Sequence, residues 1–304
     1  MADSKTIKRR IKSISNTGKI TKAMELVAAS KMQRAVNSVL ATRPYARLAW
    51  QTINAVGKAT GEVSHPLLKI NEDASKTLFV LFTSDRGLAG ALNTNMNKAA
   101  VKAVKNIEGD VEAIAIGKRG NMALARAEVP VIASFEGLTN KPAFKDVLPI
   151  GTMILEEYKK GTYREVLIGY TDFKSALTQQ PTILKLLPLG QPEDLEGLGE
   201  TDDAELTERK ELSGLRELSE YTFEPSPAEV LNKILPRLIE TMVYQALLEA
   251  AASEHSARMM AMRNASDNAQ EMLKELTLTY NRIRQAGITQ EIAEISAGAA
   301  AIQN

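Results

Sequence analysis

Residues 11–32 of the chain read IKSISNTGKITKAMELVAASKM, and they lie within a helical stretch that we expect to cover about residues 5–57. Apolar residues recur there in steps of three and four within three successive sets: Ile7, Ile11 and Ile14; Ile20, Met24 and Val27; and Ala28, Met32, Ala35 and Val39. Such steps are typical of the seam of a coiled coil. The offsets between the sets predict a seam that drifts around the helix.

A second long helical stretch is predicted from Pro227 to about Gln285 or beyond. Its start is well marked, because Ser226 is a preferred capping residue, Pro227 suits the first helical position and Glu229 lies three residues after the cap. Small and apolar residues then repeat in the same steps at Met259, Met262, Ser266, Ala269, Leu273, Leu276, Tyr280 and Ile283. Isolated helices of this length need a partner, so we expect the two stretches to pack against each other.

Between the two helical stretches, the pattern changes to alternating strands and helices. We expect strands at residues 77–83, 112–116, 129–135, 165–170 and 181–188, and helices at residues 93–106, 118–127 and 144–160. This alternation favours an α/β, Rossmann-like body with a mainly parallel sheet. The predicted division is a long helix in residues 1–75, the body in 76–224 and a long helix in 225–304. Within the body, we expect an acidic connection near residues 191–218 and an edge strand at residues 220–224.

The composition excludes several kinds of chemistry. The 304 residues include no cysteine and only two histidines, so disulfides, thiol catalysis and thiolate metal sites are excluded, and a histidine-based metal site is not expected. The net charge of +1 hides an uneven distribution: residues 5–34 carry nine basic and one acidic side chain, whereas residues 193–224 carry twelve acidic and three basic ones. No signal peptide or membrane-spanning run is found. We therefore expect a cytoplasmic protein, or one bound to something at a membrane.

One loop has the position of a phosphate-binding site. Residues 84–90 read SDRGLAG and lie between a predicted strand and a predicted helix, where many α/β proteins bind phosphate. The spacing of its glycines, however, matches neither common nucleotide-binding motif. We favour the alternative, a tight turn in which Arg86 is exposed as a contact for a partner.

Four acid–base candidates remain, namely His65, Asp85, Asp172 and His255. They lie far apart in the sequence, and their spacing fits no catalytic dyad or triad. His255 falls on the seam of the second long helix, where a packed, hydrogen-bonded histidine is expected. We therefore predict no catalytic, cofactor-binding or metal-binding residue.

The basic N-terminal stretch leaves further interpretations open. Its cations include Lys8, Arg9, Arg10, Lys12, Lys19 and Lys22. They suit nucleic acid, although no aromatic side chain is interleaved, or they suit the carboxylates of a partner protein. A DNA-organising scaffold and a phosphate-binding α/β enzyme thus stand as alternatives to the favoured interpretation, a long helical protein with a mechanical or spacing role.

Three stretches of the chain together resemble the gamma subunit of F-type ATP synthases. They are residues 11–32, residues 84–93 and residues 254–268, the last followed by residues 281–291. Their order and their flanking helices agree along essentially the whole chain. The cysteine-bearing insertion of photosynthetic relatives is absent, so the chain is similar to the bacterial type. The family's middle motif usually carries Cys and Gly where this chain has Ala89 and Ala91, and we expect no thiol switch.

The resemblance implies both a fold and a function. In this family the terminal helices form a long antiparallel coiled coil inside a ring of three alpha and three beta subunits. The α/β body lies beside the epsilon subunit and rests on the membrane ring of c subunits. The resemblance therefore implies a non-catalytic central rotor that transmits torque between the c ring and the catalytic ring and imposes asymmetry on the catalytic sites. It further implies no cofactor, no nucleic-acid partner, and a peripheral location on the cytoplasmic face of the bacterial plasma membrane.

The resemblance also implies which residues contact partners. Near the moving lobes of the beta subunits we expect Lys22, Met24 and Arg258. Where the coiled coil meets the beta-subunit loops that grip it, we expect Arg284, Gln285 and Thr289.

Overall fold

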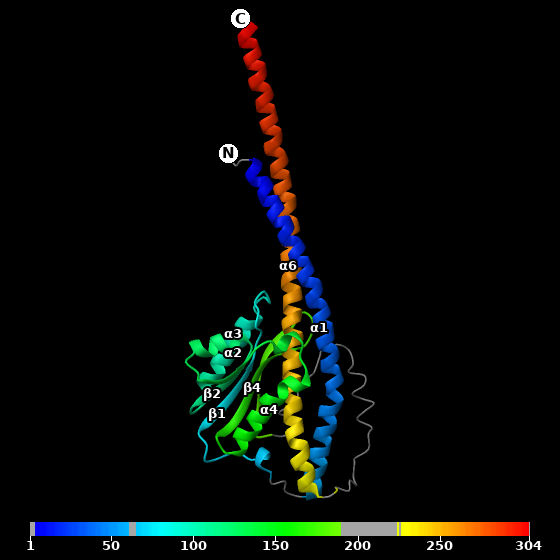
Figure 1. Ribbon diagram of the computed structural model, residues 1–304, viewed down its shortest axis with the longest axis vertical. Helices are drawn as coiled ribbons and strands as arrows, with labels where there is room; N and C mark the ends of the chain where they lie inside the picture. Colours follow the sequence, from blue (N-terminus) through cyan, green and yellow to red (C-terminus); the bar gives the residue numbers. More distant parts are fainter. Residues whose placement is uncertain (1–3, 61–64, 190–223, 225, 304) are drawn as a thin grey trace. The chain divides into compact units, whose positions relative to one another are not determined.

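The computed structural model in Figure 1 describes residues 4–60, 65–189, 224 and 226–303 of the chain. Both predicted long helices are present, as α1 (Ser4–Thr60) and α6 (Pro227–Gln303). The contacts divide the chain into two compact units, one of Met1–Val27 with Met259–Asn304 and one of Ala28–Arg258. Each unit therefore contains part of both long helices. The predicted acidic connection and nearly all of the predicted strand at residues 220–224 lie outside the described residues.

In the first unit, α1 and α6 pack through a continuous heptad seam. Seam positions on α1 step by four and three and are buried or half-buried: Ile7, Ile11, Ile14, Gly18, Thr21 and Glu25. Every position predicted for the seam of α6 from Met259 to Ile283 is likewise buried or half-buried. A Cβ atom placed on Gly18 would lie 3.3 Å from the Cβ of Ala269, so the two backbones approach closely at this point.

The prediction of a drifting seam on α1 is wrong. Ile20 and Val27 are 60% and 56% exposed, although they were expected to lie in the seam. Their places are taken by Gly18, Thr21 and Glu25, which keep the steps of four and three unbroken. The Thr21 hydroxyl donates to the Gly18 carbonyl at 3.0 Å, so it is satisfied within its own helix. Hydrophobicity alone pointed to the isoleucine and the valine, whereas the seam follows the heptad register and has a small residue, Gly18, where the two backbones approach closely.

The burial of α6 ends where α1 begins. Ser4 lies fourteen residues before Gly18, and Ile283 lies fourteen residues after Ala269, which is the spacing of an antiparallel pair. Ile283 is half-buried, whereas residues 284–298 are all exposed. In the second unit the helices also run antiparallel, since the Thr42 hydroxyl binds the Gln245 side chain and Ala35 shares a small apolar cluster with Ala251 and Ala252.

The second unit is built around a five-stranded sheet. Its strands are β1 (Lys76–Phe82), β2 (Val111–Ile116), β3 (Val131–Phe135), β4 (Tyr163–Phe173) and β5 (Gln179–Leu187). They lie in the order β3-β2-β1-β4-β5, and all neighbours are parallel except β4 and β5. This confirms the predicted α/β body, its five strands and its mainly parallel sheet.

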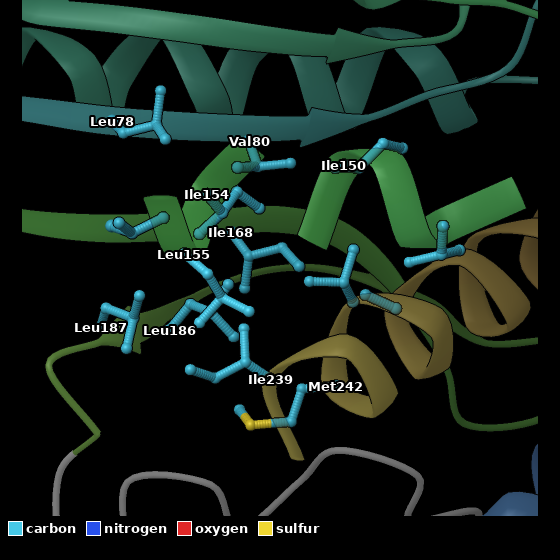
Figure 2. Packing of buried hydrophobic residues seen from close by; sticks show 14 of the residues in the cluster. Leu78, Val80, Ile150, Ile154, Leu155, Ile168, Leu186, Leu187, Ile239 and Met242 are labelled. Carbon is cyan, nitrogen blue, oxygen red and sulfur yellow. The ribbon is translucent and has the colours of Figure 1, made fainter. Parts of the chain in front are cut away.

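Both faces of the sheet are covered, because alternate residues of β1 point to opposite sides. Phe79 and Leu81 pack with α2 (Leu92–Asn106) and α3 (Lys118–Arg126), through Met96 and Leu124. The other face meets α4 (Phe144–Lys159) and the first part of α6. Figure 2 shows Leu78 and Val80 on this face, with Ile150 and Ile154 of α4 and Ile239 and Met242 of α6. The start of α6 is therefore anchored in the core of the body.

The cap at the start of α6 is as predicted. The N–H of Glu229 donates to the Ser226 hydroxyl at 3.3 Å, which confirms Ser226 as the cap of α6. Two short 3₁₀ helices, η1 (Pro66–Leu68) and η2 (Leu138–Asn140), complete the described elements of the body.

The starts of three strands are tied together by one carboxylate. Lys76 Nζ of β1 lies 2.7 Å from Glu112 Oε1 of β2, and the Tyr163 hydroxyl of β4 donates to Glu112 Oε2 at 2.6 Å. The hydrogen bond from Lys76, followed by the one from Tyr163, lowers the pKa of Glu112 from its ordinary value, although burial opposes this shift.

Gly18 provides a test of the helix seam. Replacing Gly18 with leucine should destabilise the helix pair of the first unit by about 1–3 kcal/mol, because the added side chain must enter a seam that is already closed. The control is Gly287→Leu, since no atom lies within 4 Å of a Cβ at that helical glycine. This control should stabilise α6 by about 0.5–1 kcal/mol through helix propensity. Amide hydrogen exchange measures the effect on the seam in residues 4–27 and 259–283 and the effect of the control in residues 284–298. An equal change in the seam residues for the two variants would contradict the seam.

Glu112 provides a pH test of the body. Its pKa is lower in the folded state, so its contribution to stability is present above the pKa of an unfolded glutamate and is lost as the pH falls through the folded-state pKa. We expect Glu112→Gln to be less stable at neutral pH and less sensitive to acid than the wild type. Denaturant unfolding at a series of pH values measures this, with exposed Glu108→Gln as the control. An unchanged acid sensitivity in Glu112→Gln would refute the role of this carboxylate.

Candidate functional site

Residues 84–90 form the loop at the carboxyl end of β1, beside the carboxyl end of β4. The chain goes from β1 outward to β2 and β3 on one side, and β4 lies on the other side. Open α/β sheets bind ligands at such a switch in strand order, outside the carboxyl ends of the strands. The geometry of this edge therefore decides between a ligand site and a structural turn.

The loop is held by hydrogen bonds of its own side chains. Asn93, at the start of α2, accepts from the Ser84 N–H at 3.2 Å and donates to the Ser84 hydroxyl at 2.8 Å. The Ser84 hydroxyl also donates to the Arg86 carbonyl at 2.6 Å, which closes a tight turn. Arg86 itself is exposed, as expected for a turn that offers this side chain to a partner.

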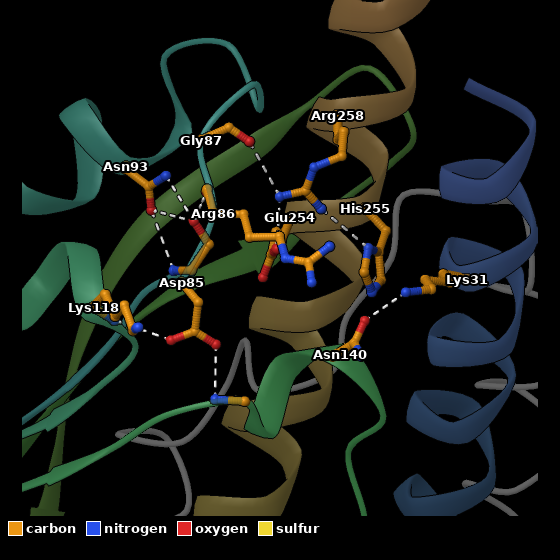
Figure 3. A network of polar contacts seen from close by, with 12 residues as sticks. Lys31, Asp85, Arg86, Gly87, Asn93, Lys118, Asn140, Glu254, His255 and Arg258 are labelled. Atoms are coloured by element: carbon orange, nitrogen blue, oxygen red, sulfur yellow. Dashed lines mark hydrogen bonds and ion pairs between the residues drawn. The ribbon is translucent and has the colours of Figure 1, made fainter. Parts of the chain in front are cut away.

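Asp85 has a structural part in the same edge. Its carboxylate accepts from the Lys118 N–H at 3.1 Å and from the Gly137 N–H at 2.8 Å, so it joins the start of α3 to the loop after β3 (Figure 3). Gly117 precedes α3 at a φ of 94°, and a Cβ there would lie 2.2 Å from the Thr83 carbonyl oxygen. This position therefore requires glycine. Both carboxylate oxygens of Asp85 are used to brace the turn.

Helix α6 closes the edge where a Rossmann-like sheet would hold its ligand. Arg258 donates to the Gly87 carbonyl at 3.4 Å, and its guanidinium forms an ion pair of 2.7 Å with Glu254 one turn earlier (Figure 3). The side chains of Arg258 and Glu254 are only 11% and 6% exposed. The loop thus contacts a helix of the same chain, which supports the predicted structural turn over nucleotide binding.

The two histidines are both part of packed structure. His255 is buried beside Arg258, whose guanidinium lies 3.4 Å from His255 Nδ1. Burial lowers the pKa of His255, and the cations of Arg258 and Lys31 lower it further, against Glu254 and a hydrogen bond to the backbone of Thr139. His65 accepts from the Leu67 N–H at 3.1 Å and lies 3.0 Å from the Asn232 side chain.

The fourth acid–base candidate is also engaged. Asp172 is buried near the end of β4 and forms an ion pair of 3.0 Å with Lys174. In the described part of the chain, no group of three or more His, Cys, Asp or Glu side chains is arranged to hold a metal ion. None of the described helices has the length and apolarity needed to cross a bilayer.

The seven predicted contact residues fall into two groups. In the first unit, Lys22, Arg284, Gln285 and Thr289 are exposed, and Met24 is half-buried. Lys22 also pairs with Glu25 at 2.9 Å. In the second unit, the structure brings exposed Arg86 and largely buried Arg258 to the same loop (Figure 3).

Sequence reasoning missed two features of the site. The ion pair between Glu254 and Arg258 could have been predicted, because the two residues lie four positions apart on a predicted helix. The bond from Arg258 to Gly87 carries no such signal, because it joins residues 171 positions apart.

A long antiparallel helix pair, whose second helix packs in the core of an α/β body and contacts the loop at the carboxyl end of β1, defines the class of protein. Comparisons with known proteins agree with this class. The ATP synthase family model matches residues 3–302. An ATP synthase gamma chain of Herpetosiphon aurantiacus is 44% identical over 315 residues, covering 99% of each chain. The gamma chain of Desulfitobacterium hafniense is 38% identical over 303 residues, covering 100% of each.

Solved structures share the fold. The central stalk of the Tetrahymena thermophila mitochondrial ATP synthase matches with a TM-score of 0.58 and 24% identity, over 81% of this chain and 99% of that one. A chain of the Euglena gracilis mitochondrial ATP synthase matches with a TM-score of 0.64 and 21% identity, over 98% of this chain and 94% of that one.

The chain therefore belongs to the ATP synthase family, among its gamma chains. It is therefore a gamma subunit of that complex.

The ion pair at the loop yields a prediction for the body. Arg258→Met should destabilise the second unit by about 3–5 kcal/mol, because Glu254 would be left buried without its cation. Replacing both residues, as Arg258→Met with Glu254→Gln, should recover most of this loss. Denaturant unfolding followed by circular dichroism measures the stability, with the exposed Arg263→Met on the same helix as the control. A double variant as unstable as Arg258→Met alone would contradict the role of the ion pair.

Proposed function

We propose that this chain is the central rotor between a ring of three alpha and three beta subunits and a membrane ring of c subunits, with an epsilon subunit beside its body. One observation carries the proposal. Residues 284–298 of α6 remain helical although all are exposed among the described residues. An unsupported helix of this kind needs an outside partner.

The exposed end of α6 carries an apolar stripe suited to such a partner. Ile288, Ile292 and Ile295 lie four and three residues apart, on one face of the helix, and are 46%, 59% and 72% exposed. Exposed apolar groups in a row mark a contact surface. A smooth apolar sleeve formed by the ring would cover this stripe and still permit rotation, because no charged side chain follows Glu294.

The first unit offers a second kind of contact surface. Ile20, Leu26 and Val27 are exposed on α1, beside a series of exposed cations at Lys8, Arg9, Arg10, Lys12 and Lys19. Apolar and basic groups together suit partner lobes that present apolar side chains and carboxylates. Lys22 and Met24 lie in this region, and we propose that they contact the beta subunits. Exposed Arg86 is proposed as a contact for a partner of the body, and Arg258, which is only 11% exposed and paired with Glu254, is proposed to lie near the same lobes of the beta subunits.

The proposed mechanism follows from symmetry. A helix pair has no three-fold axis, so it cannot make the same contacts with three identical catalytic subunits at once. Differences in contact free energy then favour a different conformation in each subunit. Rotation of the helix pair transfers each preference to the next subunit. Arg284, Gln285 and Thr289 are proposed to be the exposed polar contacts of α6 with the loops that grip it.

We further propose that the chain lies at the cytoplasmic face of a bacterial plasma membrane, held there by the complex. The relatives that support the bacterial assignment are bacterial gamma chains. Purification of a tagged chain from membranes tests the whole proposal: recovery of a ring ATPase with c subunits supports it. Recovery of the chain alone or with nucleic acid overturns it.

The free end of α6 gives a mutational test. Deleting residues 295–304 should weaken assembly or the coupling of ATP hydrolysis to proton pumping, while the denaturant unfolding of the α/β body stays unchanged. A variant of full length, with Ile288, Ile292 and Ile295 all replaced by glutamine, should act in the same direction.

The control for these variants is Gln290→Ala, because Gln290 forms a surface hydrogen bond with Glu294 at 2.9 Å and lies outside the apolar stripe. Normal coupling in the triple glutamine variant would refute the apolar sleeve. Unfolding of the body after the deletion would show that the tail has a structural role instead.

A further inference from the structure

One segment of α6 is enclosed on every side within the second unit. All twelve residues from Gln245 to Ser256 are buried, which is more than three helical turns without an exposed position. By contrast, residues 263–283 of α6 bury a stripe and expose the rest, and residues 284–298 are all exposed. The body and α1 together therefore enclose α6 along this segment.

A hairpin from the sheet makes two polar contacts to this segment. Strand β4 pairs with β1 only as far as Gly169, and the residue opposite Thr171 on β5 is Pro181, which has no N–H. The Thr171 carbonyl therefore has no strand donor on either side. The Ser253 hydroxyl of α6 donates to it at 3.0 Å, in a buried position.

The turn of the same hairpin makes a second contact. The Ser256 hydroxyl donates to the Ala176 carbonyl at 2.7 Å. Gln179 Nε2 donates to the same carbonyl at 3.0 Å and to the Ser256 hydroxyl at 3.4 Å, so the turn is braced around this contact. Between the two contacts, Phe173 packs in a cluster with Ala251 and Ala252 of α6.

The two serines together oppose both rotation of α6 about its axis and sliding of α6 along it. They lie three residues apart and so on the same face of the helix. Both are fully buried, and both donate to backbone carbonyls of one hairpin. Apolar packing is non-directional and tolerates small rotations of a helix, whereas hydrogen bonds weaken steeply when their angle changes.

We propose that residues 171–179 act as a strap that sets the rotational position of α6 relative to the sheet, with Ser253 and Ser256 as the positioning residues. Torque applied to the body then turns α6 by the same angle as the sheet. This inference rests on the proposed rotor function, because it concerns the transfer of load between the body and α6.

The test uses the assembled complex with a Ser253→Ala, Ser256→Ala double variant. ATP hydrolysis should stay within about twofold of the wild type, since neither serine is among the proposed ring contacts. The ratio of proton pumping to hydrolysis should fall at least twofold, and the torsional stiffness of the rotor in single-molecule rotation should fall with it. Thr279→Ala is the matched control, because Thr279 is exposed and its hydroxyl donates within its own helix, to the Glu275 carbonyl at 2.9 Å.

A second measurement separates a lost strap from a misfolded body. Amide hydrogen exchange should speed up in residues 171–179 and stay unchanged in β1 and β2. If exchange rises throughout the sheet, the single variant Ser256→Ala, at the turn, replaces the double variant in the coupling assay. A normal ratio of proton pumping to hydrolysis, with normal torsional stiffness, in a folded variant would refute the strap. The rotor function is judged separately: it is supported if the wild-type complex pumps normally.

Discussion

The close antiparallel approach of α1 and α6 is the constraint on which the rest of the structure depends. Helices of 57 and 77 residues are far too long to persist on their own propensity. Each seam position is therefore occupied by a residue that lets the two helices touch. Glycine, threonine and alanine serve this purpose as well as isoleucine does. Beyond Ile283 the seam has no partner within the described chain, and the stripe of Ile288, Ile292 and Ile295 is exposed.

The sheet follows from a second constraint, which is the burial of both of its faces. Strand β1 is almost wholly apolar because helices cover it on both sides. One of those covering helices is α6, so the body and the long helix share one core. The carboxyl edge of the sheet, which in related architectures binds a ligand, is used here to hold α6 through Glu254, Arg258 and the Gly87 carbonyl.

Much of the fold could be read from the sequence because its signals are local. Strand and helix periods, the cap at Ser226 and the glycine turn after β1 all depend on neighbours within a few residues. The seam of α1 was misassigned at Ile20 and Val27 because hydrophobicity measures a preference for burial, whereas the seam is decided by the distance between two backbones. The site shows the same limit: the turn was predicted, but the partners of Asp85 and Arg258 were not.

The sequence by itself determined the two long helices, the α/β body between them and the exclusion of thiol chemistry, since these follow from periodicity and composition. It also determined the family, through long runs that match gamma chains. Only the tertiary structure decided that α6 fills the carboxyl edge of the sheet and that Ser253 and Ser256 reach the hairpin. Those contacts join residues about 80 to 170 positions apart, and hydrogen bonds across such separations are set by packing and leave no periodic trace in the chain.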